Sequence, residues 1–265
     1  MPSYAILGAT GQVGRSILDA LLHPSSTTPN NNIEIRTFVR SKQKLLNMRP
    51  ALTSHPKTTI YEGQMTNTAL LASCIQDTRA VFLCIAATEN VPNCTVAQEQ
   101  AHAVVAALET LKAPKPPKLV ILSSASLEPH LMVDLPAVFS VIMKAAASNV
   151  YADLRLAESY LRSKAPAGTE LIFIKPGGLV HDTPVGHRLS TTRQQTFLSF
   201  ADLGAGMVEA ADSEAGAWDD AKGNVSVVPA REGTRIEWYV PWYLVKGLLF
   251  HFVPGLYPYL IGILP

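Results

Sequence analysis

The sequence is poor in features that mark several common classes of protein. It has 22 basic and 21 acidic residues, so it lacks the excess of positive charge that nucleic-acid binding requires. Only three cysteines are present, Cys74, Cys84 and Cys94. Because their number is odd and their spacing is wide, we expect reduced thiols instead of disulfides or a close-spaced metal motif.

Targeting and membrane segments are also lacking. Residues 1–22 contain no basic region ahead of their apolar run, as a signal peptide would, and we therefore expect a cytoplasmic protein. The apolar stretch near the C-terminus is interrupted by Lys246 and by three prolines, Pro241, Pro254 and Pro258. These residues argue against a single membrane-spanning helix.

Motifs of metal enzymes and hydrolases are missing as well. His130, His181 and His187 are separate in the sequence and show no metal-ligand spacing. No Gly-x-Ser-x-Gly motif accompanies them. We therefore expect no metal site and no hydrolase.

The 265 residues, 48% of them hydrophobic, are enough for a sizeable core. Short, continuously apolar runs alternate with amphipathic helical patterns. Apolar runs of this kind are typical of parallel strands covered on both faces. The pattern predicts an α/β fold with a doubly wound parallel sheet, the Rossmann fold. The expected strands are residues 4–7, 33–39, 58–61, 80–86, 119–123 and 170–174, and the expected helices are residues 12–22, 95–111 and 149–163.

The regular alternation fades after the segment Lys175–Pro176–Gly177–Gly178. We therefore expect a dinucleotide-binding domain over residues 1–178. Residues 179–265 are expected to form a smaller substrate-binding lobe over the carboxyl edge of the sheet.

A glycine-rich turn follows the first expected strand and opens the first helix. In the segment GATGQVG, Gly8 suits a tight turn, Gly11 lets the backbone approach a pyrophosphate, and Gly14 lets the helix pack close to the strand. Free N–H groups and the positive helix end meet there. The alternative is a tight turn with no ligand. The candidate cofactor-binding residues in this turn are Gly8, Thr10, Gly11, Gln12, Val13 and Gly14.

The end of the second strand favours NADP(H) over NAD(H). An acidic residue for a ribose 2′-hydroxyl is missing there, whereas Arg40 can face a 2′-phosphate, supported by Ser41 and Lys42. A solvated basic turn is the alternative. Gln64 could pair with the adenine edge or belong to a plain surface turn, and Pro176 is a further candidate for cofactor contact.

Two segments carry candidate catalytic residues. Ser124 and Ser126 follow the fifth strand, where a hydroxyl can bond a substrate carbonyl or simply cap a turn. Tyr151 and Arg155 are four residues apart on a helix and share a face. A fixed cation favours the phenolate, which makes tyrosine a usable acid or base. The alternative is an ordinary amphipathic helix in which Arg155 pairs with Glu158.

These segments together resemble a known family. GATGQVG, FVRS, SSAS and VYADLRLAE, in that order, are similar to atypical short-chain dehydrogenases/reductases of the NmrA-like type. The start MPSYAILGATG and the helix NVYADLRLAESYLRS look more specifically like the fungal averufin oxidase A family of aromatic polyketide pathways. The resemblance is good over residues 1–178 and looser beyond, although LSFADLGAGMVEAAD looks like a late helix of that group.

The resemblance implies an NADPH-dependent oxidoreductase acting on an aromatic polyketide intermediate of the anthraquinone or xanthone type. Active reductases of the family carry lysine four residues after the tyrosine, where this chain has Arg155. Arginine keeps its charge and cannot relay a proton as lysine does. Lys144 could substitute. The alternatives are a non-catalytic NADP(H)-sensing protein, or a non-redox isomerase or dehydratase on the same fold.

The aromatic-rich tail, residues 238–261, leaves three interpretations open. It could wall a pocket for a flat aromatic substrate, since offset ring stacking favours such ligands. It could instead rest on a membrane surface or on a second subunit, and a homo-oligomer is possible. Plain packing against the small lobe is the third interpretation.

Overall fold

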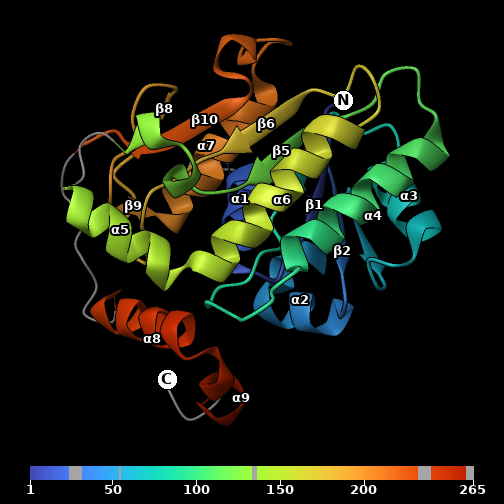
Figure 1. Cartoon of the computed structure of the whole chain (residues 1–265). Coiled ribbons are helices and arrows are strands. Elements are labelled where there is room, and N and C mark those ends of the chain that lie inside the picture. The colour runs from blue at the N-terminus through green and yellow to red at the C-terminus, as the bar shows by residue number, and fades with distance from the viewer. Residues whose placement is uncertain (24–31, 54, 133–135, 232–239, 261–265) are drawn as a thin grey trace.

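The computed structural model describes residues 1–23, 32–53, 55–132, 136–231 and 240–260 (Figure 1). An eight-stranded sheet forms its centre, in the order β3-β2-β1-β4-β5-β6-β10-β8. All neighbouring strands are parallel except β10 and β8, which are antiparallel. The strands are β1 (Ser3–Leu7), β2 (Glu34–Val39), β3 (Thr58–Glu62), β4 (Ala80–Leu83), β5 (Lys118–Leu122), β6 (Leu171–Ile174), β8 (His187–Ser190) and β10 (Asn224–Pro229).

Helices cover both faces of this sheet, which confirms the predicted doubly wound fold (Figure 1). One core joins the sheet to α1 and α7, for example through Ile17 and Met207. The other joins it to α3, α4 and α6, through residues such as Val104 and Leu161. The bounds are α1 (Gln12–Leu22), α2 (Lys42–Met48), α3 (Thr68–Ile75), α4 (Val96–Leu111), α5 (Ala137–Ala146), α6 (Ser148–Lys164), α7 (Phe200–Asp212), α8 (Val240–Phe252) and α9 (Tyr257–Leu260).

The apolar runs form strands because both of their faces are covered. Every residue of β1 and of β4 is buried. An isolated strand of this kind would expose apolar surface on two sides, so it is stable only between two layers of helices. The parallel arrangement brings the carboxyl ends of β1, β4, β5 and β6 to one edge, where the glycine turn and the serines also lie.

The chain beyond residue 178 contributes to the main sheet. β10 pairs with β6, β8 pairs with β10, and α7 packs against α1. Helix α8 packs against α5, and Figure 1 shows α8 and α9 at one end of the molecule. The division at residue 178 stays a prediction, but part of the expected lobe shares layers with the Rossmann sheet. In the described part of the chain, no helix has the length and apolar content to cross a membrane.

Candidate active site

The glycine turn brings the start of α1 against the end of β1. Gly8 has a φ of 97°, in the left-handed region that favours glycine, and its carbonyl oxygen accepts the N–H of Gly11 at 2.9 Å. A Cβ on Gly14 would lie 2.2 Å from the oxygen of Gly8. Both positions therefore exclude a side chain for reasons of backbone geometry.

The first turn of α1 offers backbone donors to an anion. Gly11 is the N-cap residue, has an extended backbone and makes no side-chain cap. The first N–H groups of a helix have no partner within the helix, so those of Gln12 and Val13 suit a phosphate. The side chain of Val13 is buried in the core, Gln12 is exposed, and Thr10 is half-buried in the turn. These residues fit the diphosphate of a dinucleotide.

A cavity of about 350 Å³ lies beside this turn. It is bounded by the first two turns of α1 and by the segment that follows the short strand β7 (Leu179–Val180). The lining includes Gln12, Arg15, Ser16, Arg49, His181 and Asp182. The space next to the free N–H groups is thus partly enclosed and carries basic side chains.

The end of β2 carries exposed basic side chains and leads into a capped turn. Arg40 is exposed, as binding a 2′-phosphate requires. The hydroxyl of Ser41 caps α2 by accepting the N–H of Lys44 at 3.2 Å. The N–H of Lys42 donates to Glu62 Oε1 at 3.0 Å, and this carboxylate comes from the end of β3. An acidic group therefore lies near the carboxyl end of β2, although the residues at that end provide none.

Gln64 lies in a surface turn after β3. Its side chain is exposed, and its carbonyl oxygen accepts the N–H of Asn67 at 2.9 Å. The side chain of Asn67 caps α3 by accepting the N–H of Leu70. The backbone of Gln64 therefore serves the turn before α3.

The serine turn, residues 123–128, leaves the carboxyl end of β5. The Oγ of Ser124 accepts the N–H of Ser126 at 3.3 Å and so caps a short 3-10 helix, while Ser126 is 8% exposed. Pro176 lies alongside, and its carbonyl oxygen accepts the N–H of Ala125 at 3.0 Å. Ser124 therefore acts as a turn cap, as one of the two interpretations expects, and its hydroxyl proton stays available for a donor role.

Tyr151 lies in the first turn of α6 and is half-buried. It packs against the same apolar core as Ile85, which follows β4, and Leu127, which belongs to the serine turn. Arg155 is exposed one turn further along. Glu158 does not point to Arg155 as in the alternative interpretation; its partner is Lys175.

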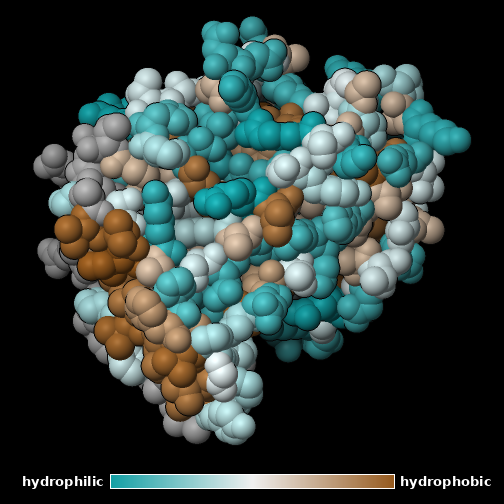
Figure 2. All heavy atoms as spheres, in the orientation of Figure 1, coloured by the Kyte–Doolittle hydropathy of each residue, from teal (hydrophilic) through white to brown (hydrophobic). Residues whose placement is uncertain are grey.

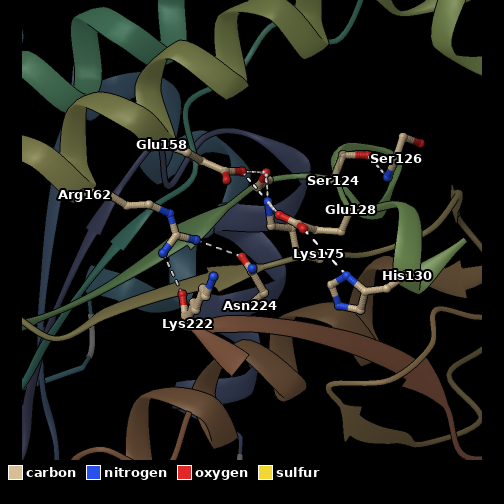
Figure 3. A network of polar contacts seen from close by, with 10 residues as sticks. Ser124, Ser126, Glu128, His130, Glu158, Arg162, Lys175, Lys222 and Asn224 are labelled. Atoms are coloured by element: carbon tan, nitrogen blue, oxygen red, sulfur yellow. Dashed lines mark hydrogen bonds and ion pairs between the residues drawn. The ribbon is translucent and has the colours of Figure 1, made fainter. Parts of the chain in front are cut away.

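A buried ionic cluster, unexpected from the sequence, lies between the serine turn and α6 (Figure 3). The side chain of Lys175 is 0% exposed, and its Nζ lies 2.5 Å from Glu158 Oε1 and 3.2 Å from Glu128 Oε1. The hydroxyl of Ser123 donates to Glu158. One signal was visible in the sequence: Lys175 directly follows a continuously apolar strand, where a charged side chain needs partners.

A second cavity, of about 160 Å³, lies where α8 covers the loop after β4. Helix α8 is held there by an ion pair between Lys246 Nζ and Glu89 Oε1 at 2.9 Å, and by the bond from Asn90 Nδ2 to the oxygen of Gly247 at 2.9 Å. The lining includes Ala87, Asn90, Met143, Ala147, Val150 and Tyr243. Val150 precedes Tyr151, so the cavity adjoins the start of α6, which we call the tyrosine helix because it carries Tyr151.

The outer surface of this region is apolar. Figure 2 shows hydrophobic side chains gathered over α5 and α8. Val138 and Val141 are exposed on α5, Phe252 on α8 and Tyr259 on α9. The described part of the tail, residues 240–260, therefore has one side on a cavity and another side facing outward; residues 238, 239 and 261 lie outside the described residues.

The thiols are not activated. Burial raises the pKa of Cys74 to about 12 and that of Cys94 to about 11, and it also raises the pKa of Cys84. All three cysteines are free. Among the described residues, no group of histidine, cysteine and carboxylate side chains is arranged to hold a metal ion.

Strand, glycine turn and uncapped helix together define a dinucleotide-binding protein of the Rossmann type. A family model described as NAD(P)H-binding matches residues 8–214, and the chain belongs to this family. The match spans the glycine turn, the serine turn, the tyrosine helix and α7. A nicotinamide dinucleotide is therefore the cofactor.

Fungal relatives are similar over nearly the whole chain. Oxidoreductase stcQ of Emericella nidulans is 45% identical over 98% of this chain and 94% of its own length. Oxidoreductase aflX of Aspergillus parasiticus is 43% identical over 98% of this chain and 95% of its own length. These findings confirm the resemblance to NmrA-like reductases and to the averufin oxidase A family, and the chain is an oxidoreductase of this type.

Solved structures agree on the fold. A short-chain dehydrogenase/reductase from Veillonella parvula in complex with NADP matches with a TM-score of 0.57 and 18% identity, over 86% of this chain and 95% of that one. A second Veillonella parvula short-chain dehydrogenase/reductase matches with a TM-score of 0.62 and 16% identity, over 89% of this chain and 99% of that one. At such identities the likeness concerns the fold alone.

Proposed function

We propose that the protein is an NADPH-dependent reductase that acts on a carbonyl or quinone-like ring of an aromatic polyketide intermediate, of the anthraquinone or xanthone type, in fungal secondary metabolism. The observation that carries the proposal is the cavity under α8. It adjoins the start of the tyrosine helix at the carboxyl edge of the sheet, where doubly wound folds bind ligands.

Arg40 supports NADPH as the cofactor. It is exposed at the end of β2, and its bidentate guanidinium suits a 2′-phosphate. The Ser41 hydroxyl caps α2, and the backbone N–H of Lys42 is bonded to Glu62, so from these two residues the exposed ammonium of Lys42 is the group that can support Arg40. Selectivity in this proposal therefore rests mainly on Arg40, whose planar guanidinium can bond two phosphate oxygens at once.

The protein's residues divide the remaining chemistry among them. The dinucleotide, when bound at the glycine turn, would supply the hydride. Tyr151 donates its phenolic proton to the carbonyl oxygen that becomes a hydroxyl, and Ser124 or Ser126 orients that oxygen by a hydrogen bond. Arg155 provides a fixed positive charge one turn from Tyr151 but cannot relay protons. Tyr151 in this scheme recovers its proton from water.

The lining of the cavity suits one ring of an aromatic substrate. Met143, Val150 and Tyr243 provide apolar and aromatic surface, and Asn90 and the ion pair Glu89–Lys246 add polar groups at the same place. Flat rings gain from contact with aromatic side chains, while hydroxyl groups need polar partners. Of the three interpretations of the tail, this proposal adopts the one in which the tail forms a wall of the substrate pocket.

The direct test is turnover. Purified protein is mixed with NADPH and a dihydroxyanthraquinone or a naphthoquinone, and the absorbance band of the reduced nicotinamide is followed. We expect oxidation that depends on both reactants, with a reduced ring as product. Binding of NADPH without oxidation by any quinone or aromatic ketone would contradict the proposal.

Arg40→Ala tests the cofactor preference. A charge-assisted hydrogen bond contributes about 1.5–3 kcal/mol, so its removal is expected to raise the Kd for NADPH by about 10–100-fold and to leave the Kd for NADH nearly unchanged. Calorimetric titration measures both. Lys44→Ala, an exposed change on α2, is the control and is expected to alter neither affinity. An equal loss for both coenzymes would show that Arg40 does not select the phosphate.

Ala147→Phe tests the cavity. Ala147 lines it at the junction of α5 and α6, and a phenyl ring there would occupy much of its 160 Å³. We expect the KM for the quinone to rise at least about 10-fold, with the Kd for NADPH unchanged. Val141→Phe adds the same group on the outward face of α5, where Val141 is 67% exposed, and serves as control. An unchanged KM in Ala147→Phe would place the substrate elsewhere.

A further inference from the structure

The serine turn is held at both of its ends by one side chain. Lys175 follows β6 and is fully buried, with Nζ 3.4 Å from Ser123 Oγ and 3.2 Å from Glu128 Oε1. Ser123 opens the turn and Glu128 closes it, and the two candidate catalytic serines lie between them. The third contact, to Glu158 Oε1 at 2.5 Å, reaches α6 (Figure 3).

Glu158 lies seven residues, about two turns, after Tyr151 on the same helix. The helix is held again one turn further on, where Arg162 donates to the oxygen of Lys222 and to Asn224 Oδ1 (Figure 3). The contact to Glu158 therefore links the serine turn to a helix that is itself fixed on the sheet. Lys175 joins the two elements that carry the proposed catalytic hydroxyls.

We propose that Lys175 is a positioning residue, which fixes the turn of Ser124 and Ser126 against the helix of Tyr151. This inference rests on the proposed function, because it concerns the geometry of the same proton transfer. An ammonium has three N–H donors, and Ser123, Glu128 and Glu158 provide three acceptors. No donor is left for substrate, so Lys175 acts through its partners.

An ionic link suits this task better than apolar packing. Apolar contacts have no preferred direction, whereas hydrogen bonds to an ammonium define both distance and angle. A misplacement of about 1 Å in reacting groups can lower a rate by about 100-fold. A buried ion pair is weak evidence for stability, since well-packed apolar residues can replace it. Its contribution here is to geometry.

Glu128 offers the sharpest test. Changing Lys175 would leave two carboxylates without their cation and endanger folding. Glu128 is 22% exposed, and its loss leaves the pair of Lys175 and Glu158 intact. Glu128→Ala removes one anchor of the turn, and Glu128→Gln keeps an acceptor oxygen at the same place.

An ion pair at the opposite, amino-terminal ends of β5 and β6 provides a matched control. Lys118 at the start of β5 pairs with Glu170, just before β6, at 3.3 Å, and Glu170 is 19% exposed. Glu170→Ala therefore removes an ion pair of similar length and burial that lies far along both strands from the serine turn.

Kinetics and hydrogen exchange are measured for all three variants with NADPH and the quinone that the wild type reduces. In Glu128→Ala we expect kcat to fall about 10–100-fold, the KM for NADPH to stay within about two-fold, and the amides of residues 123–128 to exchange about 10-fold faster. Glu128→Gln is expected to recover most of the kcat. Glu170→Ala should match Glu128→Ala in thermal stability and the wild type in kcat.

Equal losses of kcat in the two alanine variants, or unchanged exchange across residues 123–128 in Glu128→Ala, would overturn the inference. Exchange also separates this inference from the proposed function. If none of the quinones tested is reduced by the wild type with NADPH, the proposed function fails. Faster exchange confined to the serine turn of Glu128→Ala would then still support the role of Lys175 in fixing this turn, and unchanged exchange would still refute it.

Discussion

Tyr151→Phe is expected to lower kcat by about 10²–10⁴-fold, the range that a positioned general acid contributes. The change removes one oxygen from a half-buried ring and keeps its packing against the apolar core that Ile85 and Leu127 also contact. The Kd for NADPH should therefore stay within about two-fold of the wild-type value. Loss of kcat with retained cofactor affinity indicates an interaction made in the transition state.

The measurement is steady-state oxidation of NADPH with the accepted quinone, together with titration of NADPH into each protein. Tyr160→Phe is the matched control. Tyr160 lies on the same helix and is also half-buried, with its ring centroid 4.0 Å from that of His102 on α4. It lies well away from the cavity under α8, and the variant should keep full activity. Full turnover in Tyr151→Phe would show that Tyr151 is not the proton donor, and a hydroxyl of the serine turn would then be the candidate.

The sequence predicted the central strands well because their signal is local. The strands observed within the expected runs 80–86 and 170–174 are residues 80–83 and 171–174. These shorter segments are apolar on both faces, and two layers of helices bury nearly all of their residues. The glycine turn was equally visible. At Gly8 the positive φ, and at Gly14 the approach of a backbone oxygen, each require the absence of a side chain. These constraints act within a few residues of one another.

Other features depend on residues that are distant in the sequence. Glu62 lies near the end of β2 only because β3 is its neighbour in the sheet. Spacing along α6 allows Glu158 to pair with Arg155, three residues away, but Glu158 pairs with Lys175, which follows β6. The outcome follows from burial, because an exposed arginine can be satisfied by water while a buried ammonium needs a charged partner. The spacing of residues along one helix does not show which charged side chains become buried in the fold.

Gly14→Ala is expected to remove measurable affinity for NADPH, with a rise in Kd of at least about 100-fold. In an exposed helix this change would add about 1 kcal/mol of stability. Here the new Cβ would lie 2.2 Å from the oxygen and 2.8 Å from the carbonyl carbon of Gly8. The start of α1 must therefore move away from β1, which misplaces the N–H groups of Gln12 and Val13. We also expect the free energy of unfolding to fall by about 1–3 kcal/mol, as in other overpacked sites.

The control for this change is Gly255→Ala, since a Cβ there would meet no atom within 4 Å. It should leave both affinity and stability nearly unchanged. Calorimetric titration of NADPH and denaturant unfolding measure the two effects separately. If Gly14→Ala lowered stability but kept the wild-type Kd, the first turn of α1 would not be the diphosphate site. If it kept both, α1 would not start as close to Gly8 as the described geometry requires. The proposed reductase therefore depends on this one approach of backbone to backbone, because it sets the position of the N–H groups that would hold the diphosphate.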